Sequence, residues 1–119
     1  MNWAARSKLS RTVRSNVADV VVAPRFHVGD RVTVRAAYPI GHVRTPYYVR
    51  GKHGIIERLC GAYPNPEELA YARSGLPKQP LYRVRFLQRD LWANYAGQPT
   101  DVVEVEIYQH WLEAQGQAP

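Results

Sequence analysis

The residue types with the most chemical potential gather in one short segment, 41–51, which reads GHVRTPYYVRG. Its basic and aromatic members are His42, Arg44, Tyr47, Tyr48 and Arg50, placed around Pro46. If the chain is extended there, the even-numbered residues can share one face, although the proline departs from strict strand geometry. Two guanidinium groups near one point would hold a carboxylate, a phosphate or a sulfur oxyanion. The arginines can equally pair with acids of this chain, and the pattern leaves both interpretations open.

Elsewhere the sequence offers no set of residues for catalysis or metal binding. The four histidines share no close metal-ligand spacing, and they are His27, His42, His53 and His110. Cys60 is the one cysteine, so no internal disulfide and no cysteine cluster can form within this sequence. Next to Gly61 at a predicted strand end, Cys60 is typical of a small buried residue rather than a nucleophile.

The composition suits one domain with a basic half. The chain has 119 residues, of which 45% are hydrophobic and 22% charged, and its net charge is +6. Residues 1–58 carry a charge of +8 and residues 59–119 a charge of −2. A basic half indicates a solvated surface or an anionic partner, with nucleic acid the first to consider. Yet 13 of the 16 basic residues are arginine, which also suits interfaces between proteins.

Neither a membrane span nor a secretory signal is expected. No run of 18 or more apolar residues exists, and Met1 to Val22 lacks a continuous apolar centre. We therefore expect a cytoplasmic protein.

The pattern divides the chain into a basic N-terminal arm, 1–24, and a domain, 25–119. The arm could form a short helix over 10–20. Alternating polar and apolar residues predict four strands, at 31–35, 54–59, 81–86 and 102–107. Four short strands separated by turn residues indicate a mostly β fold, a small antiparallel barrel.

Helical signals are few. Asn65 is a good N-cap before Pro66, and acids follow in the first turn, which predicts a helix to Arg73 that ends before Gly75. Single turns are expected at 88–94 and 109–113, where Trp92 and Trp111 would close the ends of the barrel.

One part of the sequence resembles the short nucleic-acid-binding modules of ribosomal and transcription elongation proteins. The similar segments are VGDRV at 28–32 and GKHGII at 51–56. Those modules are also SH3-like barrels. However, the intervening loop is longer than in such modules, and the aromatics suited to base stacking do not lie along a strand.

A more extensive resemblance is to the C-terminal half of the β subunit of nitrile hydratase. Seven blocks occur in order: FHVGDRV at 26–32, GHVRTP at 41–46, YVRGKHG at 48–54, GAYPNP at 61–66, LYRVRF at 81–86, DLW at 90–92 and IYQHWLE at 107–113. Membership of this family implies an SH3-like barrel, in agreement with the predicted strands.

The resemblance also implies a division of labour between subunits. In the family, an α-type partner binds cobalt or iron in a claw of cysteines, two of them oxidised to sulfinate and sulfenate. The β-type chain holds no metal and contributes arginines that hydrogen-bond to those oxygens. The family's arginine maps onto Arg44, with Arg50 the weaker candidate. His42, Tyr47 and Tyr48 would then orient the loop at the subunit boundary.

One departure from the family pattern bears on subunit composition. A usual β subunit has a helical half before this barrel, whereas here only the short arm precedes Phe26. Three-subunit relatives, such as thiocyanate hydrolase and toyocamycin nitrile hydratase, carry the two halves on separate chains. We therefore expect the barrel subunit of a three-chain enzyme that hydrates a nitrile to an amide, with a separate chain equivalent to the missing half. A thiocyanate-hydrolysing enzyme is the alternative. The sequence leaves open whether the metal is cobalt or iron, and whether the missing half is a separate chain or was removed from this one.

Overall fold

The structure is a computed structural model that describes residues 20–39, 43–71 and 73–116. Most of the predicted arm and its expected helix lie outside the described residues, as does His42. Among the described residues, no helix has the length and apolar character needed to cross a membrane.

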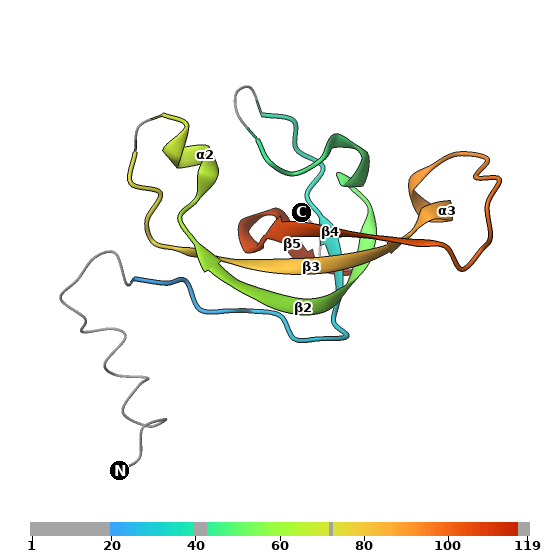
Figure 1. Cartoon of the computed structure of the whole chain (residues 1–119), viewed down its shortest axis with the longest axis horizontal. Coiled ribbons are helices and arrows are strands. Elements are labelled where there is room, and N and C mark those ends of the chain that lie inside the picture. Colours follow the sequence, from blue (N-terminus) through green and yellow to red (C-terminus); the bar gives the residue numbers. More distant parts are fainter. Residues whose placement is uncertain (1–19, 40–42, 72, 117–119) are drawn as a thin grey trace, which may run out of the picture.

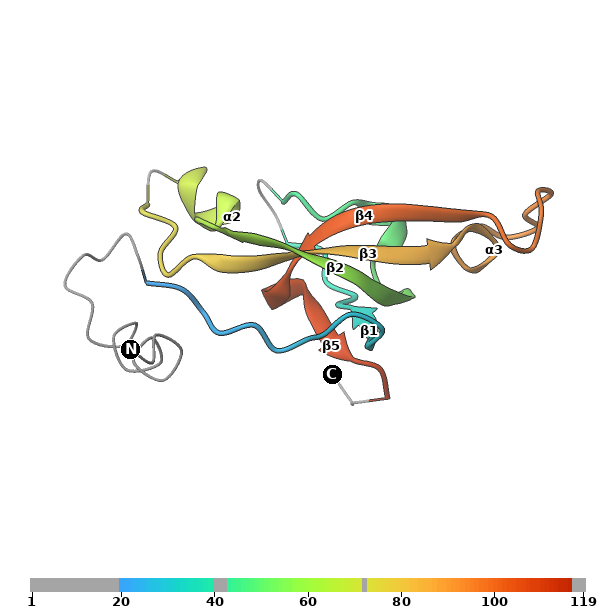
Figure 2. The same cartoon turned by 60° about the horizontal axis from the view of Figure 1, so that its bottom comes forward.

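The fold is a single curved, antiparallel sheet in the order β4-β3-β2-β1-β5. Its strands are β1 (Arg31–Val34), β2 (His53–Tyr63), β3 (Gln79–Leu87), β4 (Val102–Tyr108) and β5 (Leu112–Ala114). Figure 1 shows the long strands β2 and β3 side by side, and Figure 2 shows β1 and β5 below them at a steep angle. The predicted mostly β, SH3-like architecture is confirmed.

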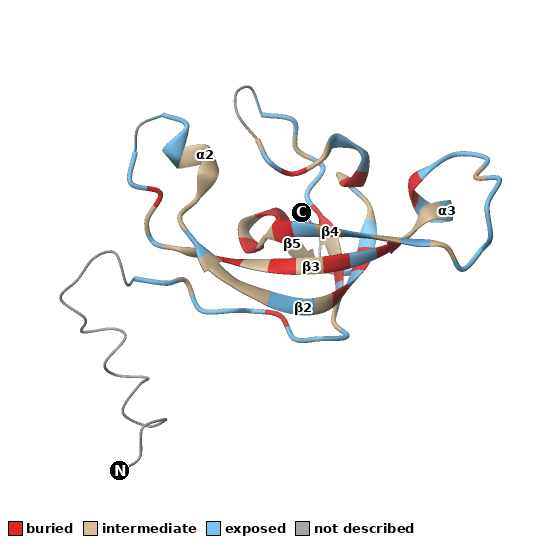
Figure 3. Cartoon of the chain, in the orientation of Figure 1, coloured by how far each residue is buried: buried red, intermediate tan, exposed pale blue. Residues whose placement is uncertain are grey.

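Strand β3 carries the alternation that the sequence predicted. Pro80, Tyr82, Val84 and Phe86 are buried on one face, and Figure 3 shows buried stretches along β3. Gly54 on β2 packs so closely on this row that a Cβ atom there would lie 2.6 Å from Cγ1 of Val84. The core therefore requires glycine at this point of the adjacent strand.

Two predictions of local structure were wrong in part. The helix α2 (Pro66–Leu69) has the predicted cap, in which the Asn65 side chain accepts a hydrogen bond from the Glu67 amide, but it ends well before Arg73. No residue of α2 is buried, so packing does not extend it beyond one turn. Residues 109–113 form the 3-10 turn η3 (Gln109–Trp111) and then β5, which pairs with β1. Three residues give too short a pattern to predict a strand.

The other expected turn, at 88–94, is the short helix α3 (Gln88–Leu91). Of the two tryptophans expected to close the barrel, Trp111 is buried but Trp92 is 44% exposed. That expectation was therefore correct only for Trp111.

A buried hydrogen-bond network ties the segment before β1 to the barrel. Oε1 of Gln109 accepts from the Tyr82 hydroxyl at 2.7 Å and from the Arg25 amide at 2.8 Å. The Gln109 amide group donates to the Ala23 carbonyl at 3.0 Å, and the Phe26 amide donates to the Tyr82 oxygen at 3.3 Å. The Tyr82 hydroxyl thus joins two segments of chain inside the core.

We predict that Tyr82→Phe lowers the free energy of unfolding by about 1–3 kcal/mol, because it leaves the buried Phe26 amide without a partner and removes one of the two hydrogen bonds that Oε1 of Gln109 accepts. Urea denaturation of the two proteins measures the difference. Tyr63→Phe is the matched control, since the Tyr63 hydroxyl makes an exposed hydrogen bond of 3.4 Å to the Cys60 carbonyl. Equal stabilities of the two variants would contradict this account of the core.

Candidate functional site

The connection between β1 and β2, which contains the segment identified above, is closed at its base by backbone hydrogen bonds. The Val34 amide donates to the Lys52 carbonyl at 2.9 Å, and the Gly51 amide donates to the Val34 carbonyl at 2.8 Å. The segment 43–50 includes the 3-10 turn η2 (Tyr47–Val49), and Val49 is fully buried. Its polar residues therefore stand on an anchored loop.

Arg50 braces this loop from within. Its Nε and one terminal nitrogen donate to the Thr45 carbonyl at 3.2 and 2.8 Å, and the other terminal nitrogen donates to the Ala37 carbonyl at 3.2 Å. Its guanidinium carbon also lies 5.0 Å from the centre of the buried Trp111 ring. The Arg50 guanidinium thus connects Ala37 and Thr45, on the two sides of the loop, and packs against the buried Trp111 ring.

Arg44 has the opposite environment. The next residue, Thr45, is buried, which fixes the backbone, whereas the Arg44 side chain is exposed. Within the described residues it forms no ion pair with a carboxylate. The two arginines therefore do not make one shared site within this chain: Arg50 holds the loop together, and Arg44 presents a guanidinium to its surroundings.

The charge of Arg44 acts on a tyrosine at the C-terminal end of β4. Burial raises the pKa of the Tyr108 phenol, while the positive charge of Arg44 lowers it. The Tyr63 phenol also raises the pKa of Tyr108. Tyr108 and Tyr63 belong to blocks that the sequence analysis singled out, but spacing alone did not associate them with Arg44.

A second contact that the sequence did not reveal fixes α2 beside this region. Oε2 of Glu67 accepts a hydrogen bond of 2.6 Å from the Trp111 indole and lies 3.4 Å from Nε2 of His110. Since Trp111 also lies against Arg50, the same indole supports both α2 and the braced loop. Glu67 and Trp111 are far apart in the sequence, so local sequence patterns could not predict this contact.

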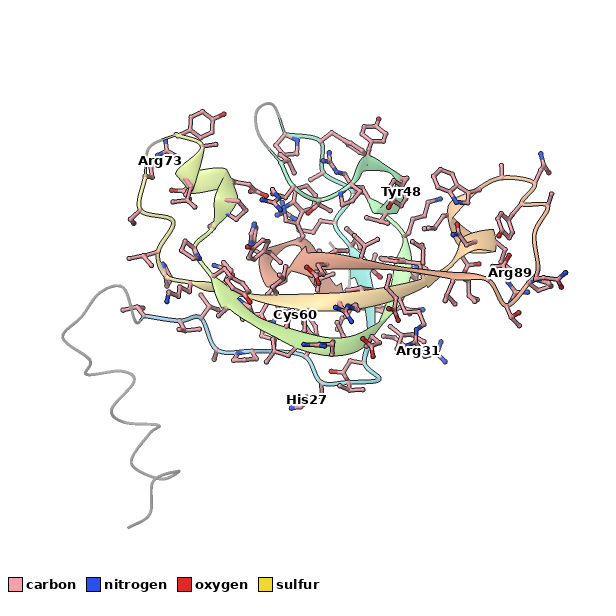
Figure 4. The ribbon with its side chains drawn as sticks, viewed as in Figure 1. His27, Arg31, Tyr48, Cys60, Arg73 and Arg89 are labelled. Carbon is pink, nitrogen blue, oxygen red and sulfur yellow. The ribbon has the colours of Figure 1, made fainter. Side chains whose placement is uncertain are left out.

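The aromatic residues of the loop are at the surface. Tyr47 is 73% exposed, and Tyr48 lies in a stacked arrangement with Trp92, with ring centres 5.3 Å apart. Figure 4 shows Tyr48 on the side of the molecule opposite His27 and Arg31. His42, also expected at this boundary, lies outside the described residues.

The described residues do not fit a metal ion. They contain no group of three or more histidine, cysteine or acidic side chains able to hold one. Burial and the Glu106 carboxylate raise the pKa of the Cys60 thiol, so this thiol stays protonated at neutral pH and is a poor ligand or nucleophile.

The arginines of β3 are paired with carboxylates of the neighbouring strands. Arg83 contacts Glu57 and Glu106, and Arg85 contacts Glu104 at 3.0 Å. Neighbouring carboxylates therefore neutralise these arginines, and a phosphate backbone would have to displace them.

Comparison with known proteins identifies the class. Residues 15–114 match the family described as nitrile hydratase beta subunit, C-terminal, and the chain belongs to this family. It is 38% identical to the nitrile hydratase subunit beta of Pseudomonas chlororaphis over 76% of its length. It is equally 38% identical to the subunit beta of the cobalt-containing nitrile hydratase of Pseudonocardia thermophila. It spans only 40% and 38% of those two relatives.

A second group of relatives matches over more of their own length. The chain is 34% identical to thiocyanate hydrolase subunit alpha of Thiobacillus thioparus and spans 71% of it. A solved structure of recombinant apo thiocyanate hydrolase from that organism superimposes with a TM-score of 0.75 at 27% identity, covering 96% of this chain and 97% of that one. The chain is thus similar both to half of a nitrile hydratase β subunit and to nearly all of a thiocyanate hydrolase chain.

We predict that Arg50→Lys lowers the free energy of unfolding by about 1–2 kcal/mol, because one ammonium group cannot reach both the Thr45 and Ala37 carbonyls with the same geometry. Urea denaturation followed by circular dichroism provides the measurement. The matched variant Arg44→Lys should unfold at the wild-type urea concentration. If both variants are equally stable, Arg50 does not brace the loop.

Proposed function

We propose that this chain is the β-type subunit of a multi-subunit nitrile hydratase, which converts a nitrile to an amide, and that it supports the metal claw of an α-type partner. The observation that carries this proposal is that Arg44 is exposed on a braced loop and forms no ion pair within the described residues. A guanidinium held out in this way suits an oxyanion on another polypeptide. The sequence resemblance makes Arg44 the first candidate for the contact with the partner. Arg50 is the weaker candidate, because its guanidinium already donates to the Thr45 and Ala37 carbonyls of its own loop.

The metal belongs to the partner in this proposal, because the described residues of this chain offer no ligand set. When bound there, Co(III) or Fe(III) supplies the Lewis-acid chemistry of the complex. Arg44 of this chain would donate hydrogen bonds to the oxygens of the partner's oxidised cysteines and hold their charge and orientation. Outer contacts of this kind change activity or metal affinity by about 10- to 100-fold when removed.

Thiocyanate hydrolysis is the second candidate function, because the thiocyanate hydrolase structure matches almost the full length of both chains. In both candidates a metal-bearing partner completes the site. They differ in substrate, so assaying the purified complex with small nitriles and with thiocyanate distinguishes them.

The experiment that tests the role of Arg44 is Arg44→Lys in the assembled complex, which keeps the charge but loses the forked donor. We predict a decrease in turnover of about 10-fold or more, with unchanged assembly. Metal content and subunit ratio are measured first, so that the turnover compares equally loaded complexes.

Arg58→Lys is the matched control, since Arg58 is an exposed arginine on β2 outside the loop. It should keep full turnover. Full turnover in Arg44→Lys as well would show that Arg44 does not support the claw.

A further inference from the structure

The face of the sheet that points away from the core contains a partly open pocket with a volume of about 240 Å³. The register places Arg31 of β1, Ile55 of β2 and Arg85 of β3 in one row across these strands. All three side chains are exposed, and each has a buried neighbour in its strand. The row therefore lines the pocket from the outer face. Figure 4 shows Arg31 on the side of the molecule opposite Tyr48.

The lining combines an apolar surface with polar side chains. Ile55, which is 42% exposed, and Leu87 provide the apolar part. His53 lines the pocket too, and a hydrogen bond of 2.8 Å between its Nδ1 and Oγ1 of Thr33 holds its ring. The acidic side chain of the lining is Asp90, on the short helix α3. An apolar surface with a few polar groups around it is typical of a small-molecule site.

This lining contains two opposite charges that are not paired. Neither Arg31 nor Asp90 forms an ion pair within the described residues, and although both line the pocket they do not pair with each other. Space for a ligand therefore lies between a guanidinium and a carboxylate. A ligand that carries both charges would satisfy the two groups at once.

Arg85 can add a further donor to this site. Its Nε and one terminal nitrogen both contact Oε2 of Glu104, at 3.1 and 3.0 Å. That arrangement leaves the other terminal nitrogen without a contact to Glu104. Because a guanidinium carries five N–H donors, Arg85 can keep its ion pair and still donate to a ligand.

We propose that this pocket binds a small zwitterion, in which a carboxylate and an ammonium group are attached to a short apolar body, as in a free aliphatic amino acid. Arg31 holds the carboxylate and Asp90 the ammonium group, while the apolar body covers Ile55 and Leu87. A simple anion fits less well, because the Asp90 carboxylate repels it. The volume lies just below the range of about 300–1,000 Å³ that is usual for drug-sized ligands, which agrees with a ligand of this size.

This inference does not depend on the proposed function, because none of the residues that carry it belongs to the segment 41–51. The experiments therefore use the full chain by itself first and the native complex second. Failure of the zwitterion site would leave the role of Arg44 untouched.

The test titrates the isotope-labelled full chain with leucine and two analogues, followed by nuclear magnetic resonance. The backbone amides of Gly54 and Ile55 report binding, because both residues line the pocket. Leucine should shift these signals saturably, with a Kd on the order of millimolar, as is usual for so small a ligand. Isocaproate lacks the ammonium group and isopentylamine lacks the carboxylate, so each should bind about 10-fold or more weakly.

Two variants separate the roles of the charges. Arg31→Gln should weaken leucine binding by about 10-fold or more, because it removes the positive charge that holds the carboxylate. Asp90→Asn should weaken leucine binding but strengthen isocaproate binding, because it removes both the attraction for the ammonium group and the repulsion of the carboxylate. A general loss of structure would not change the two affinities in opposite directions.

Arg58→Gln is the matched control, since Arg58 is exposed on β2 but does not line the pocket. It should bind leucine as the wild type does, and thermal unfolding confirms that each variant is folded. The inference is overturned if leucine causes no saturable shift, if the three ligands bind equally, or if Arg31→Gln binds leucine as tightly as Arg58→Gln. Leucine binding to the chain alone but not to the native complex would show that another chain covers the pocket, which would also overturn it.

Discussion

The guanidinium of Arg50 is the interaction on which the functional surface depends. It joins the Thr45 and Ala37 carbonyls from inside the loop and packs against the Trp111 ring. Without it, the segment between β1 and β2 would depend on η2 and the hydrogen bonds at its base. With it, the loop behaves as part of the barrel, and the exposed residues before and after η2 have defined positions.

The sheet positions the Trp111 ring against which the Arg50 guanidinium packs. Trp111 is buried because η3 turns the chain from β4 into β5, which pairs with β1 at the base of the loop. The same indole donates to Glu67 of α2, so one side chain connects the helix, the loop and the core. Arg44 and the aromatic rings of the loop are thus carried by partly buried interactions, and the side chains of Arg44 and Tyr47 stay exposed.

Local sequence patterns predicted the elements whose periodicity is long enough to detect. The alternating run in β3 and the cap at Asn65 were found, whereas the three residues of β5 and the early end of α2 were not. In the candidate site, the composition of 41–51 drew attention to a loop that the structure anchors between β1 and β2. It did not distinguish the roles of Arg44 and Arg50, because only tertiary contacts decide which guanidinium is used internally. The stacking of Trp92 on Tyr48 was missed for the same reason, since the two residues come from different loops.

The central claim is that Arg44 of this chain contacts an oxidised cysteine of a metal-bearing partner, and an experimental structure of the assembled complex tests it most directly. The account predicts a guanidinium nitrogen of Arg44 within about 3.2 Å of a cysteine sulfinate or sulfenate oxygen on the partner. Arg44 facing solvent in that complex, or contacting a chain without the metal, would contradict it.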